Sequence, residues 1–247
     1  MRVTAVLPAI AAVALAGCST VDYPNDLADI QPTENLMAAV YSPARPAEDV
    51  ARDEARQPLE TVAFAGVRRG QVIAELAPGG GYYTRILAQA VGPDGKVYAM
   101  VPARFARAEG GLDTMTAIAE QYGNVEIVVV EAFNAENLPE PVDLVWTTEN
   151  YHDLAGGEIV GAIRALRMAL KPGGIFYVED HSAPGTGLDA LPLHRIDPAA
   201  VIQQVTRNGF SLEARSDHLA NPADPHTQSP FDYDGVTDKF ALRFRRD

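Results

Sequence analysis

The sequence predicts an α/β fold in which helices cover both faces of a mostly parallel, doubly wound β-sheet. From Gly70 onward, apolar stretches that suit buried strands alternate with helical stretches, as expected for parallel strands joined by crossover helices. The first strand ends in a glycine-rich turn, Gly79-Gly80-Gly81, which opens directly into a helix. Two further turns, 92–95 and 171–174, combine Pro with Gly and are typical of the point where a helix ends and the next strand begins.

Seven strands are expected. The first five are 72–76, 96–101, 125–130, 142–147 and 175–179, and a late pair, 210–215 and 239–244, stands apart. Helices are expected at 83–91, 113–122 and 158–170. Ahead of the sheet, Pro46 suits the first turn of a helix that runs to Arg56, and Pro58 suits the start of another that ends before Gly66.

Length and composition indicate a single domain with one well-formed core, because the chain has 247 residues and 47% hydrophobic content. The formal net charge of -13 argues against a nucleic-acid substrate, since phosphate recognition needs a basic surface. The same charge argues against electrostatic docking on anionic lipid.

Residues 1–17 are expected to lie outside the fold. Arg2 supplies a positive charge, residues 3–14 form an apolar run, and Leu15-Ala16-Gly17-Cys18 follows. That tetrapeptide resembles the bacterial lipoprotein signal, in which the cysteine is lipidated; the alternative is an ordinary secretory signal with a chance cysteine. The apolar run is too short for a stable membrane span. Cys18 is the only cysteine, which favours the lipoprotein interpretation because a lone thiol outside the cytoplasm has no partner.

These observations predict three parts of the chain: a signal peptide at 1–17, a tether and N-terminal segment at 18–42, and a domain at 43–247. Ser19 after the cysteine resembles signals that sort lipoproteins to the outer membrane. The expected location is therefore the bacterial cell envelope, with the protein lipid-anchored on the periplasmic face of the outer membrane.

The spacing of the glycine turn distinguishes between two kinds of nucleotide cofactor. A dinucleotide fold requires Gly-x-Gly-x-x-Gly, and Thr84 occupies the third place when Gly79 and Gly81 are the first two, which argues against NAD. Counted from Glu75, the stretch reads acidic-x-small-x-Gly-x-Gly, with Ala77 in the small position. This spacing resembles motif I of the class I S-adenosylmethionine (SAM)-dependent methyltransferases, and Ala77 replaces the usual first glycine.

The resemblance extends over about residues 43–247, and the turn at 171–174 closely resembles the one before strand five of that superfamily. It implies a Rossmann-like, mostly parallel seven-stranded sheet with an antiparallel last strand. Four segments narrow the resemblance to a family of predicted bacterial methyltransferases, many with secretion signals. These are Tyr41–Pro46, Asn150–Asp153, Leu193–Asp197 and Asn221–Asp224.

The resemblance also implies SAM as cofactor and a set of residues that would bind it. These are Glu75, Ala77, Gly79, Gly80, Gly81, Val101 and Asn134. Glu75 would organise the turn and the methionine amino group, and the glycines would let the backbone approach the cofactor. Val101 stands where an acid usually holds the ribose hydroxyls, and Asn134 stands where an Asp usually reads the adenine amino group. Losing the ribose carboxylate costs about 1.5–3 kcal/mol, or roughly ten- to a hundredfold in affinity.

Catalytic candidates follow strands four and five, because ligands of a parallel sheet bind outside the carboxyl ends of its strands. Asn150 and Tyr151 would position an acceptor, and His152, oriented by Asp153, would take its proton. The alternative is a loop that starts a helix, with Asp153 as its cap. Asp180-His181 forms a second candidate acid–base pair, against the alternative of a surface turn.

Further polar residues lie in the loops that follow. Arg195 would hold an anionic substrate group, His194 is expected to be structural, and the connection 221–238 is expected to act as a lid. Histidines with nearby aspartates raise the question of a metal site, but their spacings match no zinc signature, so none is expected.

The sequence therefore predicts an exported, lipid-anchored SAM-dependent methyltransferase that acts on a small molecule. The first alternative is a non-catalytic ligand-binding lipoprotein on the same fold, with its grip on the cofactor relaxed at Val101 and Asn134. A hydrolase-like or metal-dependent activity of the His/Asp-rich face is a further alternative, although no Gly-x-Ser-x-Gly motif supports a serine hydrolase.

Overall fold

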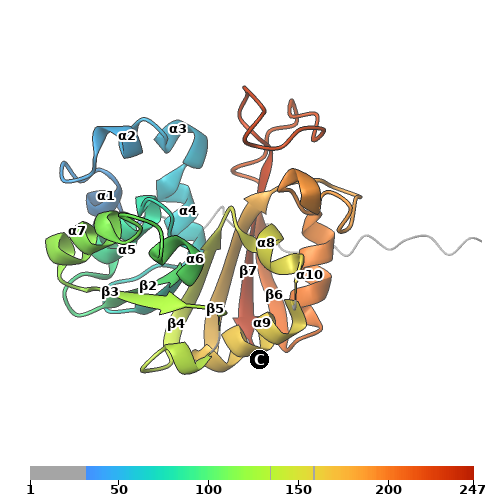
Figure 1. Cartoon of the computed structure of the whole chain (residues 1–247). Helices are drawn as coiled ribbons and strands as arrows, with labels where there is room; N and C mark the ends of the chain where they lie inside the picture. Colours follow the sequence, from blue (N-terminus) through green and yellow to red (C-terminus); the bar gives the residue numbers. More distant parts are fainter. Residues whose placement is uncertain (1–31, 134, 158) are drawn as a thin grey trace, which may run out of the picture.

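The computed structural model describes residues 32–133, 135–157 and 159–247. Cys18 and Asn134 therefore lie outside the described residues. The described chain contains one seven-stranded sheet with the order β3-β2-β1-β4-β5-β7-β6 (Figure 1). The strands are β1 Val72–Leu76, β2 Lys96–Pro102, β3 Val125–Val130, β4 Val142–Thr148, β5 Leu170–His181, β6 Phe210–Ser216 and β7 Lys239–Arg246.

The sheet confirms the predicted fold class. Strands β1 to β5 pair in parallel, whereas β7 runs antiparallel to both β5 and β6. The chain moves outward from β1 to β3 and then returns to place β4 on the other side of β1. The carboxyl ends of β1 and β4 therefore flank the point where the strand order reverses, where doubly wound sheets bind their ligands.

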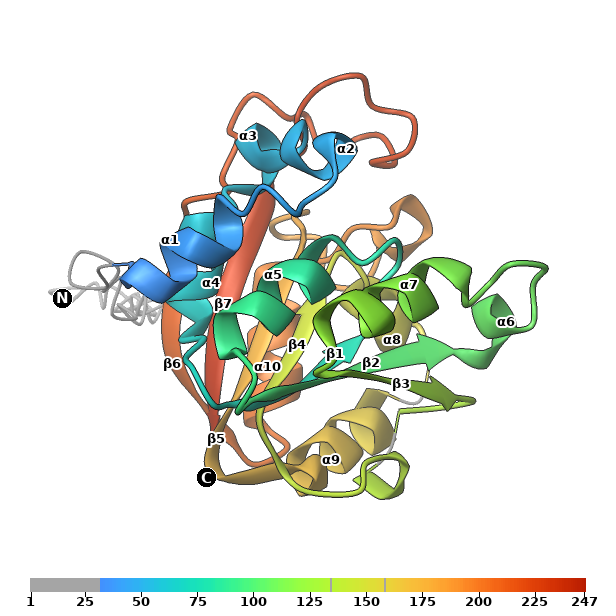
Figure 2. The same cartoon turned by 90° about the vertical axis from the view of Figure 1, so that its left-hand side faces the viewer.

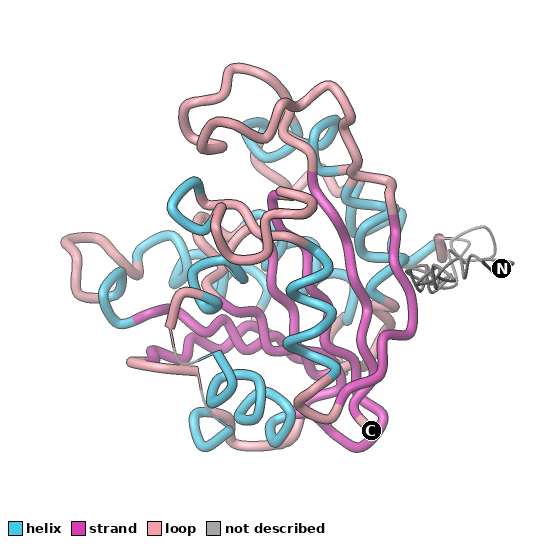
Figure 3. The backbone as a smooth tube through the Cα atoms, turned by 90° about the vertical axis from the view of Figure 1, so that its right-hand side faces the viewer, coloured by secondary structure: helices cyan, strands magenta, loops and turns pink. Residues whose placement is uncertain are grey.

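Helices cover both faces of the sheet (Figures 2 and 3). Two buried clusters form the core, one on each face. Residues of α1 Glu34–Val40, α4 Pro58–Ala65, α5 Tyr82–Val91 and α7 Asp113–Tyr122 belong to the first cluster. Residues of α8 Tyr151–Ala155, α9 Ile159–Ala169 and α10 Pro198–Thr206 belong to the second. The remaining short helices are α2 Ala47–Val50, α3 Asp53–Arg56, α6 Ala103–Ala106, η1 Ala135–Asn137 and η2 Leu191–Leu193.

The elements differ from the prediction in three places. The expected helix 46–56 is split into α2 and α3, with Gln57 left-handed at φ +39° before α4. Strand β5 begins at Leu170 and includes the expected turn 171–174 as an irregularity in its pairing with β4, and Gly173 there has φ +72°. Helix α1 lies in the segment expected to contain the tether, and its Leu36, Ala39 and Val40 are buried, so the packed chain begins before residue 43.

The long connection between β6 and β7 lies at the carboxyl edge of the parallel strands, near α2 and α3 (Figure 1). This placement follows from topology: β6 and β5 both run antiparallel to β7, so β6 ends at the same edge as β1, β4 and β5. Within the described ranges, the structure has no helix with the length and apolar character needed to cross a bilayer.

Candidate functional site

The turn after β1 presents bare backbone to open space. Gly79 and Gly81 have φ values of +56° and +80°, and Ala77 shares the left-handed region at +47°. A Cβ at Gly81 would lie 2.2 Å from Cδ1 of Ile118, whereas at Gly79 or Gly80 it would meet nothing within 4 Å. Gly81 therefore combines a left-handed backbone with a close approach to Ile118 of α7, and Gly79 and Gly80 leave the other side of the turn free for a ligand.

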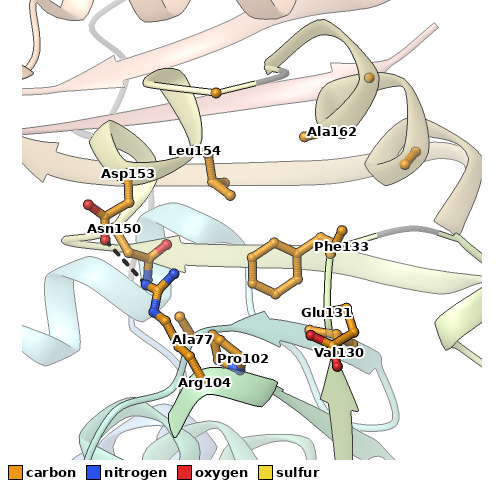
Figure 4. A pocket seen from close by; sticks show the side chains of 14 residues that line it. Ala77, Pro102, Arg104, Val130, Glu131, Phe133, Asn150, Asp153, Leu154 and Ala162 are labelled. Carbon is orange, nitrogen blue, oxygen red and sulfur yellow. Dashed lines mark ion pairs between the residues drawn. The ribbon is translucent and has the colours of Figure 1, made fainter.

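Two adjoining cavities open beside this turn and share Ala77 and Pro102 in their linings. The larger has a volume of about 490 Å³ and lies between the ends of β2 and β3 and helices α8 and α9 (Figure 4). Phe133 and Leu154 supply apolar walls there. The smaller, of about 260 Å³, is lined by Gly79, Val101 and Met115, among others. Together they form a mostly apolar cleft of the size that binds small ligands.

The predicted cofactor residues fall in or under this cleft. Val101 is the penultimate residue of β2 and lines the smaller cavity. Glu75 is 2% exposed and lies beneath the turn, where one carboxylate oxygen accepts a 2.6 Å hydrogen bond from Thr84 Oγ1 in α5. Burial raises the pKa of Glu75 to about 7, although the bond from Thr84 acts in the opposite direction. Glu75 is not among the residues that line the two cavities.

Asn150 lies at the larger cavity, whereas Tyr151 does not. Asn150 lines the larger cavity, but its amide donates to the carbonyls of Leu76 and Thr148 and accepts from Thr147. It therefore ties the end of β4 to β1. Tyr151 is fully buried, and its hydroxyl donates to Oε1 of Gln204 in α10. Its side chain points into the core because it is the first residue of α8 and faces α10, so it cannot position an acceptor in the cavity.

His152 and Asp180 form a buried pair that differs from both predicted pairings. His152 Nδ1 lies 2.8 Å from Asp180 Oδ1, and the His152 backbone N–H donates to Asp180 Oδ2. The other ring nitrogen, Nε2, lies 3.1 Å from Nδ1 of His194. Burial would lower the pKa of His152, but the hydrogen bond and charge of Asp180 raise it above the ordinary value. The expected partner Asp153 is farther away, at 3.7 Å from Nε2.

His181 lies apart from this pair, because successive side chains of a strand point to opposite faces of the sheet. Its ring contacts Oγ1 of Thr237 through Nδ1, at 2.9 Å, and burial lowers its pKa to about 4. Asp180 accepts a hydrogen bond from the backbone N–H of His181 but its ring partner is His152. The prediction that Asp180 and His181 act together as an acid–base pair is therefore wrong.

Arg195 has a structural role in place of the predicted anion-binding role. It is fully buried and forms an ion pair with Asp224 at 2.8 Å, and it also donates to the carbonyls of Ser182 and Gln228. These bonds fasten the connection 221–238 to the end of β5. The ring of Phe231, in the same connection, contacts His194 with centroids 5.0 Å apart. The segment predicted to be a lid thus packs against His194 through Phe231.

Sequence reasoning missed several residues of the cleft. Pro102 is the last residue of β2, Arg104 follows it in α6, and Phe133 follows β3; the rule that ligands bind at the carboxyl ends of strands would have found all three. Arg104 reaches across the cavity mouth to Asp153, with 3.8 Å between the guanidinium and the carboxylate (Figure 4).

A buried group of ion pairs also went unpredicted. Lys239 at the start of β7 lies 3.1 Å from both Glu149 and Glu179, and Arg56 of α3 pairs with Glu149. Burial alone would raise the pKa of Glu149, but Lys239 and Arg56 lower it to about 2. Each of the three contacts joins residues that are 60 or more positions apart in the sequence, so no local pattern reveals the group.

No family model matches this chain. Over 126 residues, half of the chain, it is 30% identical to a protein-L-isoaspartate O-methyltransferase from Ignicoccus hospitalis. Over 131 residues it is 32% identical to the ubiquinone/menaquinone biosynthesis C-methyltransferase UbiE from Ectopseudomonas mendocina. These matches span 54% and 48% of the two relatives, so the chain covers only about half the length of each.

Among solved structures, a SAM-dependent methyltransferase from Aquifex aeolicus superposes with a TM-score of 0.59 at 18% identity, covering 80% of this chain and 93% of that one. The chain has the class I methyltransferase fold. The [4+2]-cyclase SpnF shares this methyltransferase-like fold, with a TM-score of 0.55 at 18% identity and 81% of each chain covered. A class I methyltransferase fold therefore does not by itself decide which reaction a protein performs.

Proposed function

We propose that this protein is a SAM-dependent methyltransferase that acts on a small-molecule acceptor. The observation that carries the proposal is the bare backbone of Gly79, which lines the smaller of the two adjoining cavities where the strand order reverses. The two methyltransferase relatives and the Aquifex aeolicus structure support the same activity. We also propose that the chain belongs to the family of predicted bacterial methyltransferases that four of its segments resemble.

The residues of the cleft suit such a cofactor in shape more than in polar contacts. The glycine turn and the N-terminus of α5 would hold its amino-acid part, and Glu75, under the turn, fixes the position of both through Thr84. Phe133, Leu154 and Pro102 offer apolar walls for an adenine ring. When bound, SAM supplies an electrophilic methyl group on a sulfonium. The protein would contribute mainly by positioning the acceptor and excluding water.

A non-catalytic ligand-binding role on the same fold remains the second candidate. Val101 specifically favours it, because its side chain, near the end of β2 in the cleft, cannot accept hydrogen bonds from a ribose. The likeness to the cyclase SpnF also leaves room for a function other than methyl transfer.

Calorimetric titration of the full chain, purified in mild detergent, with SAM and S-adenosylhomocysteine tests the proposal. We expect weak binding that Val101→Asp tightens about ten- to a hundredfold, since the new carboxylate would accept hydrogen bonds from the ribose. Val236→Asp is the matched control, because Val236 is exposed and lies in the β6–β7 connection outside both cavities. Absence of heat and of any thermal shift at millimolar ligand would refute the enzyme proposal.

We further propose that the chain is exported and lipid-anchored through Cys18. The support is the Leu15-Ala16-Gly17-Cys18 sequence after an apolar run. In a bacterial host, wild-type protein is expected in the membrane fraction, released by detergent and labelled by a fatty-acid analogue. Cys18→Ser should lose the label. Retention of the label would show that the lipid is attached at another residue.

A further inference from the structure

Three potential metal ligands converge at the edge of the larger cavity. Nε2 of His152 lies 3.1 Å from Nδ1 of His194. Oδ1 of Asp153 lies 3.7 Å from the first nitrogen and 3.9 Å from the second. His152 and Asp153 come from α8, whereas His194 follows η2 with a left-handed backbone at φ +54°. Two sequence-distant elements therefore bring two imidazoles and a carboxylate to one point.

The triangle formed by these atoms has the dimensions of a metal site. The point equidistant from atoms separated by 3.1, 3.7 and 3.9 Å lies about 2.1 Å from each of them. Protein zinc sites have Zn–N bonds of about 2.0–2.1 Å and Zn–O bonds of about 2.0–2.2 Å. An ion at that point would thus reach all three ligands without movement of the backbone.

The groups around the triangle orient two of its three ligands. Asp180 accepts from Nδ1 of His152, so a neutral imidazole carries its lone pair on Nε2, which contacts Nδ1 of His194 at 3.1 Å; a bound ion would replace this contact between the two rings. Arg104 lies on the other oxygen of Asp153, Oδ2, at 3.8 Å, which leaves Oδ1 for a metal. Such carboxylate–histidine contacts are the usual support of metal-ligating histidines, because they fix the tautomer and the ring orientation.

We propose that His152, His194 and Asp153 bind a divalent first-row transition ion such as Zn²⁺. Two imidazoles select such ions over Mg²⁺ and Ca²⁺, which prefer oxygen ligands. The side chains of His194 and Asp153 are 42% and 49% exposed, so the ion would keep a coordination position open toward solvent. Asp153 also lines the larger cavity. An oxygen atom of a ligand bound in that cavity could therefore occupy the open coordination position of the ion.

The spacing of the sequence does not reveal this site. The expectation of no metal rested on the absence of a zinc signature, and His152 and His194 are separated by 42 positions. The proposal stands independently of methyl transfer. It also competes with the prediction that His152 acts as a base, because a ring nitrogen bound to a metal cannot accept a proton.

The test uses the full chain, purified in mild detergent, freed of metal with a chelator and titrated with Zn²⁺ by calorimetry. Co²⁺ serves as a second probe, since its visible absorption bands report the ligand geometry. We expect one ion per chain and a Co²⁺ spectrum typical of four or five nitrogen and oxygen ligands. Absence of stoichiometric binding of either ion would overturn the proposal.

Variants locate the ion. His194→Ala should weaken Zn²⁺ binding by more than about a hundredfold, because it removes a direct ligand, and Asp180→Asn by about ten- to a hundredfold, because it removes the support of His152. His194 is partly exposed and its loss should leave the fold intact, which thermal unfolding checks. His226→Ala is the matched control: His226 also pairs with a carboxylate, Asp238, at 2.9 Å, but belongs to no such three-ligand group among the described residues. Binding that survives His194→Ala unchanged would refute the proposed site.

Discussion

At the scale of single residues, three non-glycine residues with a left-handed backbone lie at the ligand edge of the sheet. Ala77, Glu149 and His194 have φ values of +47°, +56° and +54°, and each costs on the order of 1 kcal/mol or more relative to an ordinary backbone. Ala77 shapes both cavities, Glu149 belongs to the buried ion pairs, and His194 faces His152. Three of the five described non-glycine residues with positive φ thus lie at the cleft or in the charged groups beside it, and the other two are Gln57 and His226.

Glu75 shows how one residue couples the fold to the cleft. Its buried carboxyl, with a pKa of about 7, is more easily kept neutral than an exposed one, because burial penalises the charged form. A positively charged group placed near it by a ligand would reverse that preference. Above that pKa, the charged form of Glu75 is therefore less favourable for the stability of the free protein than a neutral residue would be.

At the scale of elements, a buried group of charges joins α3 to three strands. Arg56 comes from α3, Glu149 follows β4, Glu179 lies in β5, and Lys239 begins β7. Glu179 is fully buried, and Lys239 is 5% exposed. Because two carboxylates share this lysine, its charge holds the carboxyl ends of β4 and β5 to the amino end of β7.

Removing the lysine should therefore be costly. We expect Lys239→Met to lower the free energy of unfolding by about 3–5 kcal/mol, since it leaves the buried carboxylate of Glu179 without its cationic partner, whereas Glu149 keeps Arg56. Lys96→Met is the control: Lys96 pairs with Glu126 at the surface, at 3.4 Å, and its loss should cost less than about 1 kcal/mol. Urea unfolding measures both. Equal effects of the two substitutions would contradict the argument, and Glu179→Gln should restore part of the loss in Lys239→Met.

Local sequence predicted the elements well and the site poorly. The apolar stretch 72–76 matches β1 residue for residue, and helix 113–122 matches α7, because the hydrophobic periodicity of such elements is recorded in adjacent residues. The partners of His152, Asp180 and Arg195 were wrong because each pairing joins residues that are 28 or more positions apart. Which carboxylate a buried cation meets depends on strand order and register, and a single sequence does not encode these locally.

At the scale of the whole molecule, buried titratable groups set opposing dependences of stability on pH. Burial lowers the pKa of both His181 and His218 from 6.5 to about 4. Between these values the unfolded chain holds protons that the folded chain does not, so stability rises with pH. Burial raises the pKa of Glu75 from 4.5 to about 7, so there the folded chain holds the extra proton and stability falls as pH rises.

The balance of these three groups leads to a prediction between pH 4.5 and 6.5. Each proton contributes a slope of about 1.4 kcal/mol per pH unit to the free energy of unfolding. Because two histidines oppose one glutamate, the three groups together should make the free energy of unfolding rise with pH by the slope of about one proton. Glu75→Gln should steepen the slope by one proton, and His218→Gln should flatten it by one, since each removes one side of the balance. Urea unfolding at several pH values, followed by the fluorescence of the single, buried Trp146, measures the slopes. A slope that Glu75→Gln leaves unchanged would show that this carboxyl is ionised in the folded protein, and that an unseen cation or water compensates its burial.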